Sequence, residues 1–329
     1  EIDEKVMERR NEGGKEGKGD NARRSVRTNE GGRGRRDRRG GRPLVGGRMP
    51  GHEKNRGGWG HSSETCELDI IGADFVRDIE PGEIVVIDDS GLRSMRPFGD
   101  QGGRFCVFEY IYFARPDSVL EGQAVYEARS RIGRELARES GVDADVVVPV
   151  PDSGVPSAIG YAAESGIPFE LGIIRNHYVG RTFIEPTDQI RNLGVKMKHS
   201  ANRPVLAGKR VILVDDSIVR GTTSRKIVDM VRAAGATEVH MRITSPPTKH
   251  ACFYGIDTPE ESKLMAATHT LEEMREAIGV DSLAFMSFDG LYRALGHESR
   301  AEGAGRYCDA CFTGDYPISL VDKEGKLVS

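Results

Sequence analysis

Two adjacent carboxylates followed by a run of hydroxyl residues form the strongest chemical signal in the sequence. The stretch VILVDDSIVRGTTS occupies positions 211–224 and places Asp215 and Asp216 directly after four apolar residues. Hydroxyls and backbone N–H groups at the start of a helix can cradle a phosphate. Carboxylates accept hydrogen bonds from sugar hydroxyls or hold Mg²⁺. A ribose phosphate carries both kinds of group. The other polar and glycine residues expected to contact it are Ser217, Gly221, Thr222, Thr223 and Ser224.

A capped turn is the alternative interpretation of the same stretch. Asp, Ser and Thr side chains often satisfy backbone donors in turns without binding any ligand. An isolated Asp-Asp pair would favour that interpretation. A stretch of fourteen residues of these types in this order favours a ligand site instead.

The surrounding sequence predicts an α/β domain that would position this loop. Uninterrupted Val/Ile runs alternate with segments of helical spacing, which indicates a parallel sheet covered on both faces. Ligands bind beyond the carboxyl ends of the strands in such sheets. Gly141 and Gly235 are expected to end helices. The predicted strands are 105–114, 145–154, 208–216 and 238–247, and the predicted helices are 126–141 and 224–236.

The first hundred residues differ in amino-acid composition from the rest of the chain. Residues 1–35 are rich in Gly, Arg and Glu, and we expect them to be disordered because they cannot bury a core. An RGG-like RNA-binding tail is a weaker alternative, since interleaved aromatic residues are missing. Residues 67–89 contain short apolar runs around Pro81-Gly82, which predicts strands and a turn.

The stretch 211–224 resembles the binding signature for 5-phosphoribosyl pyrophosphate (PRPP) of type I phosphoribosyltransferases. The wider sequence is similar to the amidophosphoribosyltransferase family, which makes 5-phosphoribosylamine in the first committed step of purine synthesis. The resemblance implies a type I phosphoribosyltransferase fold over residues 104–329, preceded at 36–103 by the C-terminal remnant of an Ntn-type glutaminase domain. The motifs that carry it are FEYIYFARPDS (108–118), VPVPDSG (148–154), YVGRTFI (178–184), CFYGID (252–257) and CDACFTGDYP (308–317).

The resemblance also implies residue roles. Asp215 and Asp216 would hold the ribose hydroxyls and Mg²⁺, with Ser153 reaching the metal, and Gly221 to Ser224 would take the 5′-phosphate. Residues 175–200 would form a loop that closes over PRPP, where Arg175 stands in place of a frequent Lys. The implied catalytic residues in this loop are Arg175, Tyr178 and Arg181.

Cysteine spacing indicates a second site. Cys308 and Cys311 form a C-x-x-C pair, which by itself is compatible with zinc, a redox couple, an iron–sulfur cluster or buried apolar cysteines. The resemblance implies a structural [4Fe-4S] cluster. Its ligands would be Cys106, Cys252, Cys308 and Cys311, while Cys66 is not in the set.

The glutaminase half of the family is not recognisable. The family's domain begins with a catalytic Cys, whereas this sequence begins EIDEKV and contains no cysteine before Cys66. Only RDRRGGRPLVGGR (36–48) is similar to that domain. We therefore expect an amino-truncated chain that uses free ammonia and does not hydrolyse glutamine.

Composition limits the remaining function classes. The formal net charge is -4, with a basic excess in residues 1–60 and an acidic remainder, so a general nucleic-acid binder is not expected. No apolar run reaches about 18 residues, no signal peptide is evident, and the cysteine number is odd, so we expect a cytoplasmic protein without a membrane partner. The resemblance implies PRPP and ammonia or glutamine as substrates, inhibition by purine nucleotides, and a homo-oligomer.

A non-catalytic, PRPP-sensing regulator on the same fold is the alternative function. Fold alone cannot separate the two. The loop 175–200 and the complete cysteine set favour the enzyme. A helix-turn-helix before the domain would favour the regulator, and residues 1–60 contain none.

Overall fold

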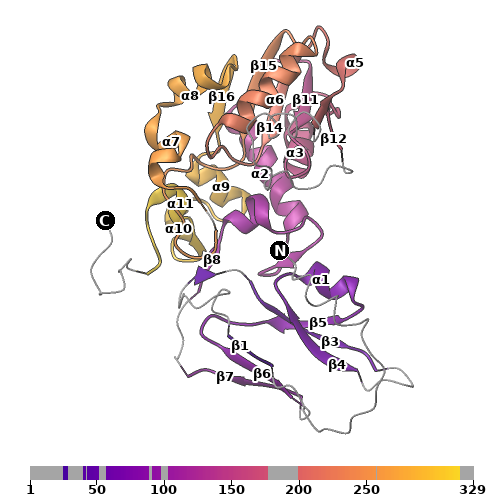
Figure 1. The fold of residues 1–329 in the computed structure, drawn as a ribbon, viewed down its shortest axis with the longest axis vertical. Coiled ribbons are helices and arrows are strands. Elements are labelled where there is room, and N and C mark those ends of the chain that lie inside the picture. The colour runs from indigo at the N-terminus through magenta and orange to yellow at the C-terminus, as the bar shows by residue number, and fades with distance from the viewer. Residues whose placement is uncertain are drawn as a thin grey trace, which may run out of the picture.

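The computed structural model describes residues 25–28, 40–41, 43–51, 57–88, 91–97, 103–176, 199–256 and 258–318. Figure 1 shows two parts: small antiparallel sheets at one end, and an α/β domain, drawn from magenta to yellow, at the other. None of the helices in these residues is long and apolar enough to cross a membrane.

A four-stranded parallel sheet forms the centre of the α/β domain. The sequence predicts a parallel sheet and three of its strands, but not the fourth strand at 282–285. The strand order is β11-β14-β15-β16, and every neighbouring pair is parallel. Residues 146–149 and 211–214 are buried along their full length, in keeping with a sheet covered on both faces. The bounds are β11 (Val146–Pro149), β14 (Arg210–Asp215), β15 (Glu238–Ile243) and β16 (Ser282–Phe285).

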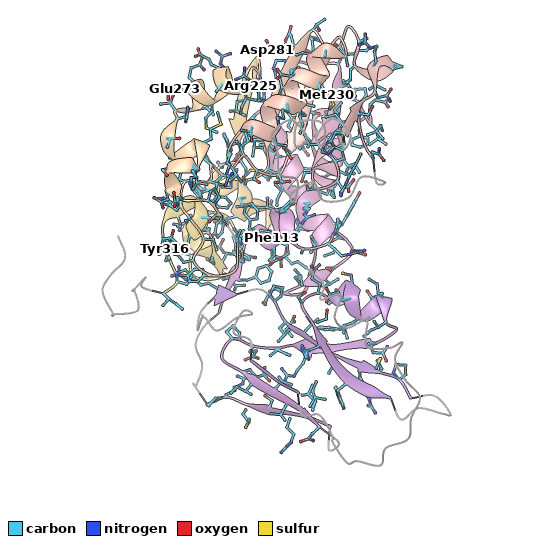
Figure 2. All side chains as sticks on the ribbon, in the orientation of Figure 1. Phe113, Arg225, Met230, Glu273, Asp281 and Tyr316 are labelled. Atoms are coloured by element: carbon cyan, nitrogen blue, oxygen red, sulfur yellow. The ribbon has the colours of Figure 1, made fainter. Side chains whose placement is uncertain are left out.

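Helices cover the two faces with separate apolar clusters. One cluster joins Val147, Ile212 and Val214 to α2 (Val125–Glu139), α3 (Val155–Ser165) and α9 (Phe288–Ala294). The other joins the alternate strand residues, such as Val211 and Leu213, to α6 (Thr222–Ala233) and α8 (Leu271–Ile278). Figure 2 labels Met230 of α6, which packs against this second cluster.

Helices α2 and α3 touch through their backbones. A Cβ on Gly133 would lie 1.9 Å from the Ser157 carbonyl oxygen, and one on Gly160 would lie 2.0 Å from the Ser130 carbonyl oxygen. Only glycine permits this approach. The contact holds α3, and with it the loop before α3, against the rest of the domain.

The segment 105–114 differs from the predicted strand. Only β8 (Arg104–Cys106) is extended, and Glu109–Phe113 forms a π-helix. The buried Arg129 guanidinium of α2 explains the difference, because it binds the carbonyl oxygens of Tyr110 (2.8 Å), Ala114 (2.7 Å) and Glu109 (3.3 Å). Tertiary contacts therefore override the β preference of the aromatic residues.

Two antiparallel sheets, β1-β6-β7 and β4-β3-β5, make up the small part. Strands at 74–78 and 84–88 flank Pro81-Gly82 as expected, but residues 65–70 form a helix. The strand at 25–28 pairs with β6, which differs from the disorder expected there. The bounds are β1 (Ser25–Thr28), β3 (Val45–Met49), β4 (Gly58–Ser62), α1 (Thr65–Ile70), β5 (Asp74–Asp78), β6 (Ile84–Asp88) and β7 (Gly91–Met95).

Short elements complete the described chain. Strand β8 lies between β2 and β17 in a three-stranded parallel sheet, and β9 pairs with β10 in a tight hairpin. The bounds of the short elements are β2 (Gly40–Gly41), β9 (Val119–Leu120), β10 (Gln123–Ala124), β12 (Ile173–Arg175), β13 (His199–Ala201), α5 (Arg203–Leu206), the 3₁₀ turn Glu261–Lys263, α7 (Met265–Thr268), α10 (Arg300–Gly303), β17 (Tyr307–Cys308) and α11 (Ala310–Thr313).

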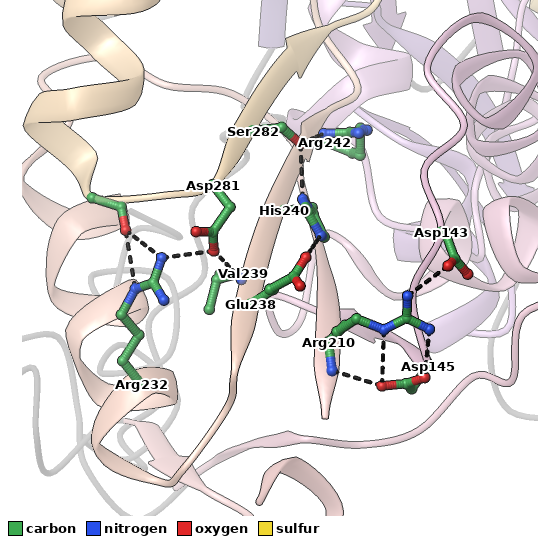
Figure 3. A network of polar contacts seen from close by, with 11 residues as sticks. Asp143, Asp145, Arg210, Arg232, Glu238, Val239, His240, Arg242, Asp281 and Ser282 are labelled. Carbon is green, nitrogen blue, oxygen red and sulfur yellow. Dashed lines mark hydrogen bonds and ion pairs between the residues drawn. The ribbon is translucent and has the colours of Figure 1, made fainter. Parts of the chain in front are cut away.

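A polar network lies at the amino edge of the parallel sheet. Arg210 at the start of β14 pairs with Asp145 (2.9 Å) and Asp143 (2.6 Å), and Arg232 of α6 pairs with Asp281 (2.8 Å) (Figure 3). These ion pairs stand at the opposite end of β14 from Asp215, so the two ends of the strand have different partners.

Candidate functional site

The acidic pair lies at the carboxyl end of β14, an interior strand of the parallel sheet. Asp215 and Asp216 are each 8% exposed. Backbone hydrogen bonds from Thr244 to the Asp215 carbonyl and from Ser245 to the Asp216 carbonyl, both 3.0 Å, tie the pair to the chain that follows β15. The pair is thus rigidly held at the edge where ligands of parallel sheets bind.

Two serine hydroxyls converge on Asp216. Ser153 donates to Oδ2 and Ser217 donates to Oδ1, each at 2.5 Å. The backbone N–H of Asp216 donates to Asp215 Oδ1 at 2.9 Å. The fold therefore brings Ser153 from the loop after β11 to the carboxylates at the end of β14, which the sequence separates by about sixty positions.

Burial raises the pKa of both carboxyls. For Asp215 the neighbouring Asp216 charge raises it further. For Asp216 the hydrogen bonds from Ser153 and Ser217 and the Arg129 charge lower the pKa and oppose burial. Both carboxyls are partly dehydrated at this strand end. A cation or hydroxyl donors bound there would stabilise their charged forms.

The loop after the acidic pair leads into the N-terminus of α6. Gly221 is the N-cap residue with φ +73°, and a Cβ there would lie 2.3 Å from Met265 Sδ. Thr222 and Thr223 are exposed in the first helical turn, whereas Ser224 is only 4% exposed. The exposed turn offers hydroxyls and helix N–H groups to an anion, while the buried Ser224 hydroxyl is less available than expected.

Arg175 approaches the site from the other side. It ends β12, which pairs with β13 so that Arg175 lies opposite His199. Its guanidinium forms an ion pair with Asp152, next to Ser153. Its Nε is buried and makes no hydrogen bond to another described residue. The predicted residues Tyr178 and Arg181, with most of the loop 175–200, lie outside the described residues.

Four of the five cysteines gather near β8 and β17. Cys106 and Cys308 are directly opposed in this parallel pair. Burial raises the pKa of Cys106, and the nearby Glu109, Cys311 and Cys308 raise it further. Burial likewise raises the pKa of Cys311, with Cys252 and Cys308 as the next causes. Cys66 lies apart, in α1 beside Glu64 and Ser118. None of the five forms a disulfide.

The gathered thiols are donors of the kind that an iron–sulfur cluster takes. Within the described ranges, no group of three or more His, Cys, Asp or Glu side chains is close enough to hold one metal ion. A four-iron cluster is larger than an ion and takes one thiolate at each of four irons. Four thiols from three chain segments, close enough to influence one another electrostatically, match that donor set.

Three residues near the site were missed by sequence reasoning. Arg129 is 2% exposed and its charge acts on Asp216. The sequence feature that could have identified Arg129 is its place, as a charged residue, on the apolar face of the predicted helix 126–141. The hydroxyls of Ser245 and Thr248 are buried without a hydrogen-bond partner among the described atoms. No spacing pattern in the sequence marks these two.

Comparisons with known proteins agree with this geometry. Residues 117–246 match the family model of the phosphoribosyl transferase domain. An amidophosphoribosyltransferase of Rhizobium etli is 57% identical over 297 residues, covering 88% of this chain and 59% of the relative. That of Bacillus subtilis is 53% identical over 259 residues, covering 79% and 54%.

Solved structures give the same result. The glutamine PRPP amidotransferase from B. subtilis complexed with ADP and GMP aligns with a TM-score of 0.77 and 51% identity, covering 86% of this chain and 60% of that one. An allosteric regulatory enzyme of purine biosynthesis aligns with a TM-score of 0.76 and 50% identity, covering 87% and 60%. The chain thus spans less than two thirds of the length of these relatives. Over the residues that they share, the chain is similar to amidophosphoribosyltransferases, and residues 117–246 match the phosphoribosyl transferase domain.

Proposed function

We propose that this chain catalyses the phosphoribosyl transfer of amidophosphoribosyltransferases, in which ammonia displaces pyrophosphate from C1 of PRPP. The observation that carries the proposal is the convergence of Ser153, Asp216 and the N-terminus of α6 at the carboxyl edge of the sheet. The relatives are named as transferases, which favours the enzyme over a PRPP-sensing regulator.

Each part of the site has a role in this reaction. The carboxylates of Asp215 and Asp216 accept hydrogen bonds from the two ribose hydroxyls. The N–H groups and hydroxyls of Gly221, Thr222 and Thr223 bind the 5′-phosphate. As the bond from C1 to pyrophosphate breaks and the bond from C1 to nitrogen forms, negative charge grows on the leaving group. Arg175 stabilises that charge, and the extra ammonia proton leaves to solvent.

Mg²⁺ fits the acidic pair, since oxygen ligands are present and burial penalises the uncompensated carboxylates. Asp215, Asp216 and the Ser153 hydroxyl would hold it, and it would neutralise pyrophosphate charge. The four gathered cysteines, Cys106, Cys252, Cys308 and Cys311, would hold a [4Fe-4S] cluster that links β8, β17 and α11 structurally.

Further parts of the proposal rest on the relatives. Purine nucleotides would bind and inhibit, because the B. subtilis structure is complexed with ADP and GMP. We assign residues 36–103 to the glutaminase part of the family and residues 104–329 to the transferase part. A homo-oligomer in the cytoplasm is the expected state.

Pyrophosphate release by the purified chain tests the proposal. With PRPP, Mg²⁺ and ammonium salts at alkaline pH, release should depend on all three. A matched reaction without ammonia should show only slow hydrolysis. Ammonia-independent release at the same rate, or no release at all, would contradict the transferase assignment.

A further inference from the structure

A buried carboxylate lies between the two cysteines of the C-x-x-C pair. Asp309 directly follows Cys308 and precedes Cys311 by two positions, and only 1% of it is exposed. Burying a carboxylate is unfavourable unless charged and hydrogen-bonding partners compensate it. The partners of Asp309 therefore indicate what this residue does for the turn that carries the two thiols.

Four hydrogen bonds from three side chains reach the Asp309 carboxylate. Arg300 forms a two-point ion pair with it, in which Nε donates to Oδ2 at 2.6 Å and Nη2 donates to Oδ1 at 3.1 Å. The Tyr292 hydroxyl donates to Oδ2 at 3.0 Å, and the Thr313 hydroxyl donates to Oδ1 at 3.1 Å. Paired hydrogen bonds between a guanidinium and a carboxylate fix direction as well as distance. Both oxygens are engaged, so Asp309 orients the turn rather than acting as a metal ligand itself.

The three partners come from three different helices. Tyr292 belongs to α9, Arg300 begins α10 and Thr313 ends α11. Tyr292 is 1% exposed and lies in the apolar cluster that joins α9 to the parallel sheet. The Asp309 carboxylate therefore fastens the C-x-x-C turn to the packed core of the α/β domain.

The position of this turn determines how the four gathered thiols meet. The Cys311 carbonyl oxygen accepts a hydrogen bond from the His250 N–H at 3.0 Å, and His250 precedes Cys252 by two positions. The pairing of β8 with β17 places Cys106 opposite Cys308. Displacing the turn would move its two thiols relative to the other two.

Charge balance explains why the carboxylate has an arginine partner. Burial raises the pKa of the Cys311 thiol most strongly, and the Cys252 and Cys308 thiols raise it further. The Asp309 charge acts in the same direction. An uncompensated carboxylate would thus disfavour thiolates, the form in which cysteine binds metals. The hydrogen bond with Asp309 raises the pKa of Arg300, which carries the compensating charge.

We propose that Asp309 is a positioning residue of the cysteine site, which holds Cys308 and Cys311 in the arrangement that an iron–sulfur cluster takes. Arg300 fixes the carboxylate and offsets its charge. The pair acts on the assembly, retention and reduction of the cluster, because the charge around a cluster sets its reduction potential. This inference rests on the proposed [4Fe-4S] cluster and not on the chemistry of the transfer reaction.

Cluster assembly in the purified full chain tests this role. The chain is freed of metal with a chelator and reconstituted anaerobically with ferrous iron and sulfide, while visible absorption, iron and sulfide are measured. Asp309→Asn should assemble the cluster at least about tenfold more slowly and lose it to the chelator at least about tenfold faster, in keeping with the loss of an outer-shell partner. Asp315→Asn is the matched control, because Asp315 also lies near Arg300 (3.5 Å) but its side chain is 56% exposed. This control should behave as the parent does.

The reduction potential of the cluster separates positioning from a general effect on folding. Asp309→Asn removes a negative charge and should raise the midpoint potential, whereas Arg300→Gln removes a positive charge and should lower it. A change that only loosened the fold would not shift the two potentials in opposite directions. Thermal melting verifies folding. The double variant Asp309→Asn/Arg300→Gln buries no unpaired charge and carries the assembly test if a single variant does not fold.

The results separate this inference from the cluster assignment. A parent chain that takes up no iron or sulfide would overturn the cluster assignment and this inference with it. If the parent assembles the cluster and Asp309→Asn, or the double variant, matches it in rate and retention, the positioning role is wrong while the cluster assignment stands. Potentials that shift in the same direction in both single variants, or not at all, would refute the charge balance.

Discussion

The Ser153 hydroxyl donates a 2.5 Å hydrogen bond to Asp216 Oδ2 and joins the ends of two neighbouring parallel strands. The loop after β11 and the loop after β14 thereby form one surface. The proposed transfer reaction would take place on this surface, and Asp215 and Asp216 form its acidic half.

Asp216→Asn should lower ammonia-dependent pyrophosphate release at least about tenfold, because an amide supplies neither the charge nor the second acceptor oxygen in a buried site. Release is measured at saturating ammonia with varied Mg²⁺ and PRPP. Asp281→Asn is the control, since this acid lies at the opposite edge of the sheet and pairs with Arg232 (Figure 3). Parent-like rates in Asp216→Asn would count against the site.

Asp215→Asn should stabilise the metal-free chain near neutral pH while lowering activity. The folded pKa of Asp215 lies above its unfolded value. The carboxyl therefore favours folding at low pH, and this contribution is lost as pH rises through the folded pKa. Each pKa unit corresponds to about 1.4 kcal/mol. Urea unfolding at pH 7 and pH 4 measures the effect, which should be large at pH 7 and small at pH 4. A variant less stable than the parent at pH 7 contradicts this electrostatic account.

Ser245→Ala and Thr248→Val should each raise the free energy of unfolding by about 1 kcal/mol. Both hydroxyls are buried without a partner in the described structure, and an unsatisfied buried polar group costs about 1–3 kcal/mol. Chemical denaturation provides the measurement. Ser157→Ala is the comparison, because Ser157 Oγ donates to the Arg129 carbonyl at 3.1 Å and its removal should destabilise. Destabilisation by all three changes would mean that the two hydroxyls have partners.

Anaerobically prepared protein should carry iron and sulfide at about four of each per chain. Cys308→Ser should lose both and lower the melting temperature, since the thiol lies beside Cys106 in the β8–β17 pair. Cys66→Ser should keep them, because Cys66 lies in α1 apart from the other four. Metal analysis with acid-labile sulfide determination decides the matter. If the protein instead carries one zinc per chain and no sulfide, the four cysteines form a zinc site and the cluster prediction is wrong.

Much of the α/β domain could be predicted from local sequence patterns. The helix at 125–139 buries Ala128, Ile132 and Leu136, the residues that the spacing selected. The prediction of a strand at 105–114 was wrong. The Arg129 guanidinium donates hydrogen bonds to three carbonyl oxygens there, which favours a π-helix. The prediction of a strand at 67–70 was also wrong. These residues belong to a helix whose Leu68 side chain is buried beside β3 and β5.

The amino-acid sequence by itself determined the parallel sheet, the acidic pair at a strand end and the phosphate-type loop, because strand and helix periodicity and the Asp-Asp-Ser and Gly-Thr-Thr-Ser groups are local properties of the chain. Tertiary structure alone decided that Ser153 meets Asp216, that Arg129 acts on the same carboxylate, and that Ser224 is buried. These relationships join segments far apart in sequence, and their distances depend on how helices and sheet pack rather than on any local preference.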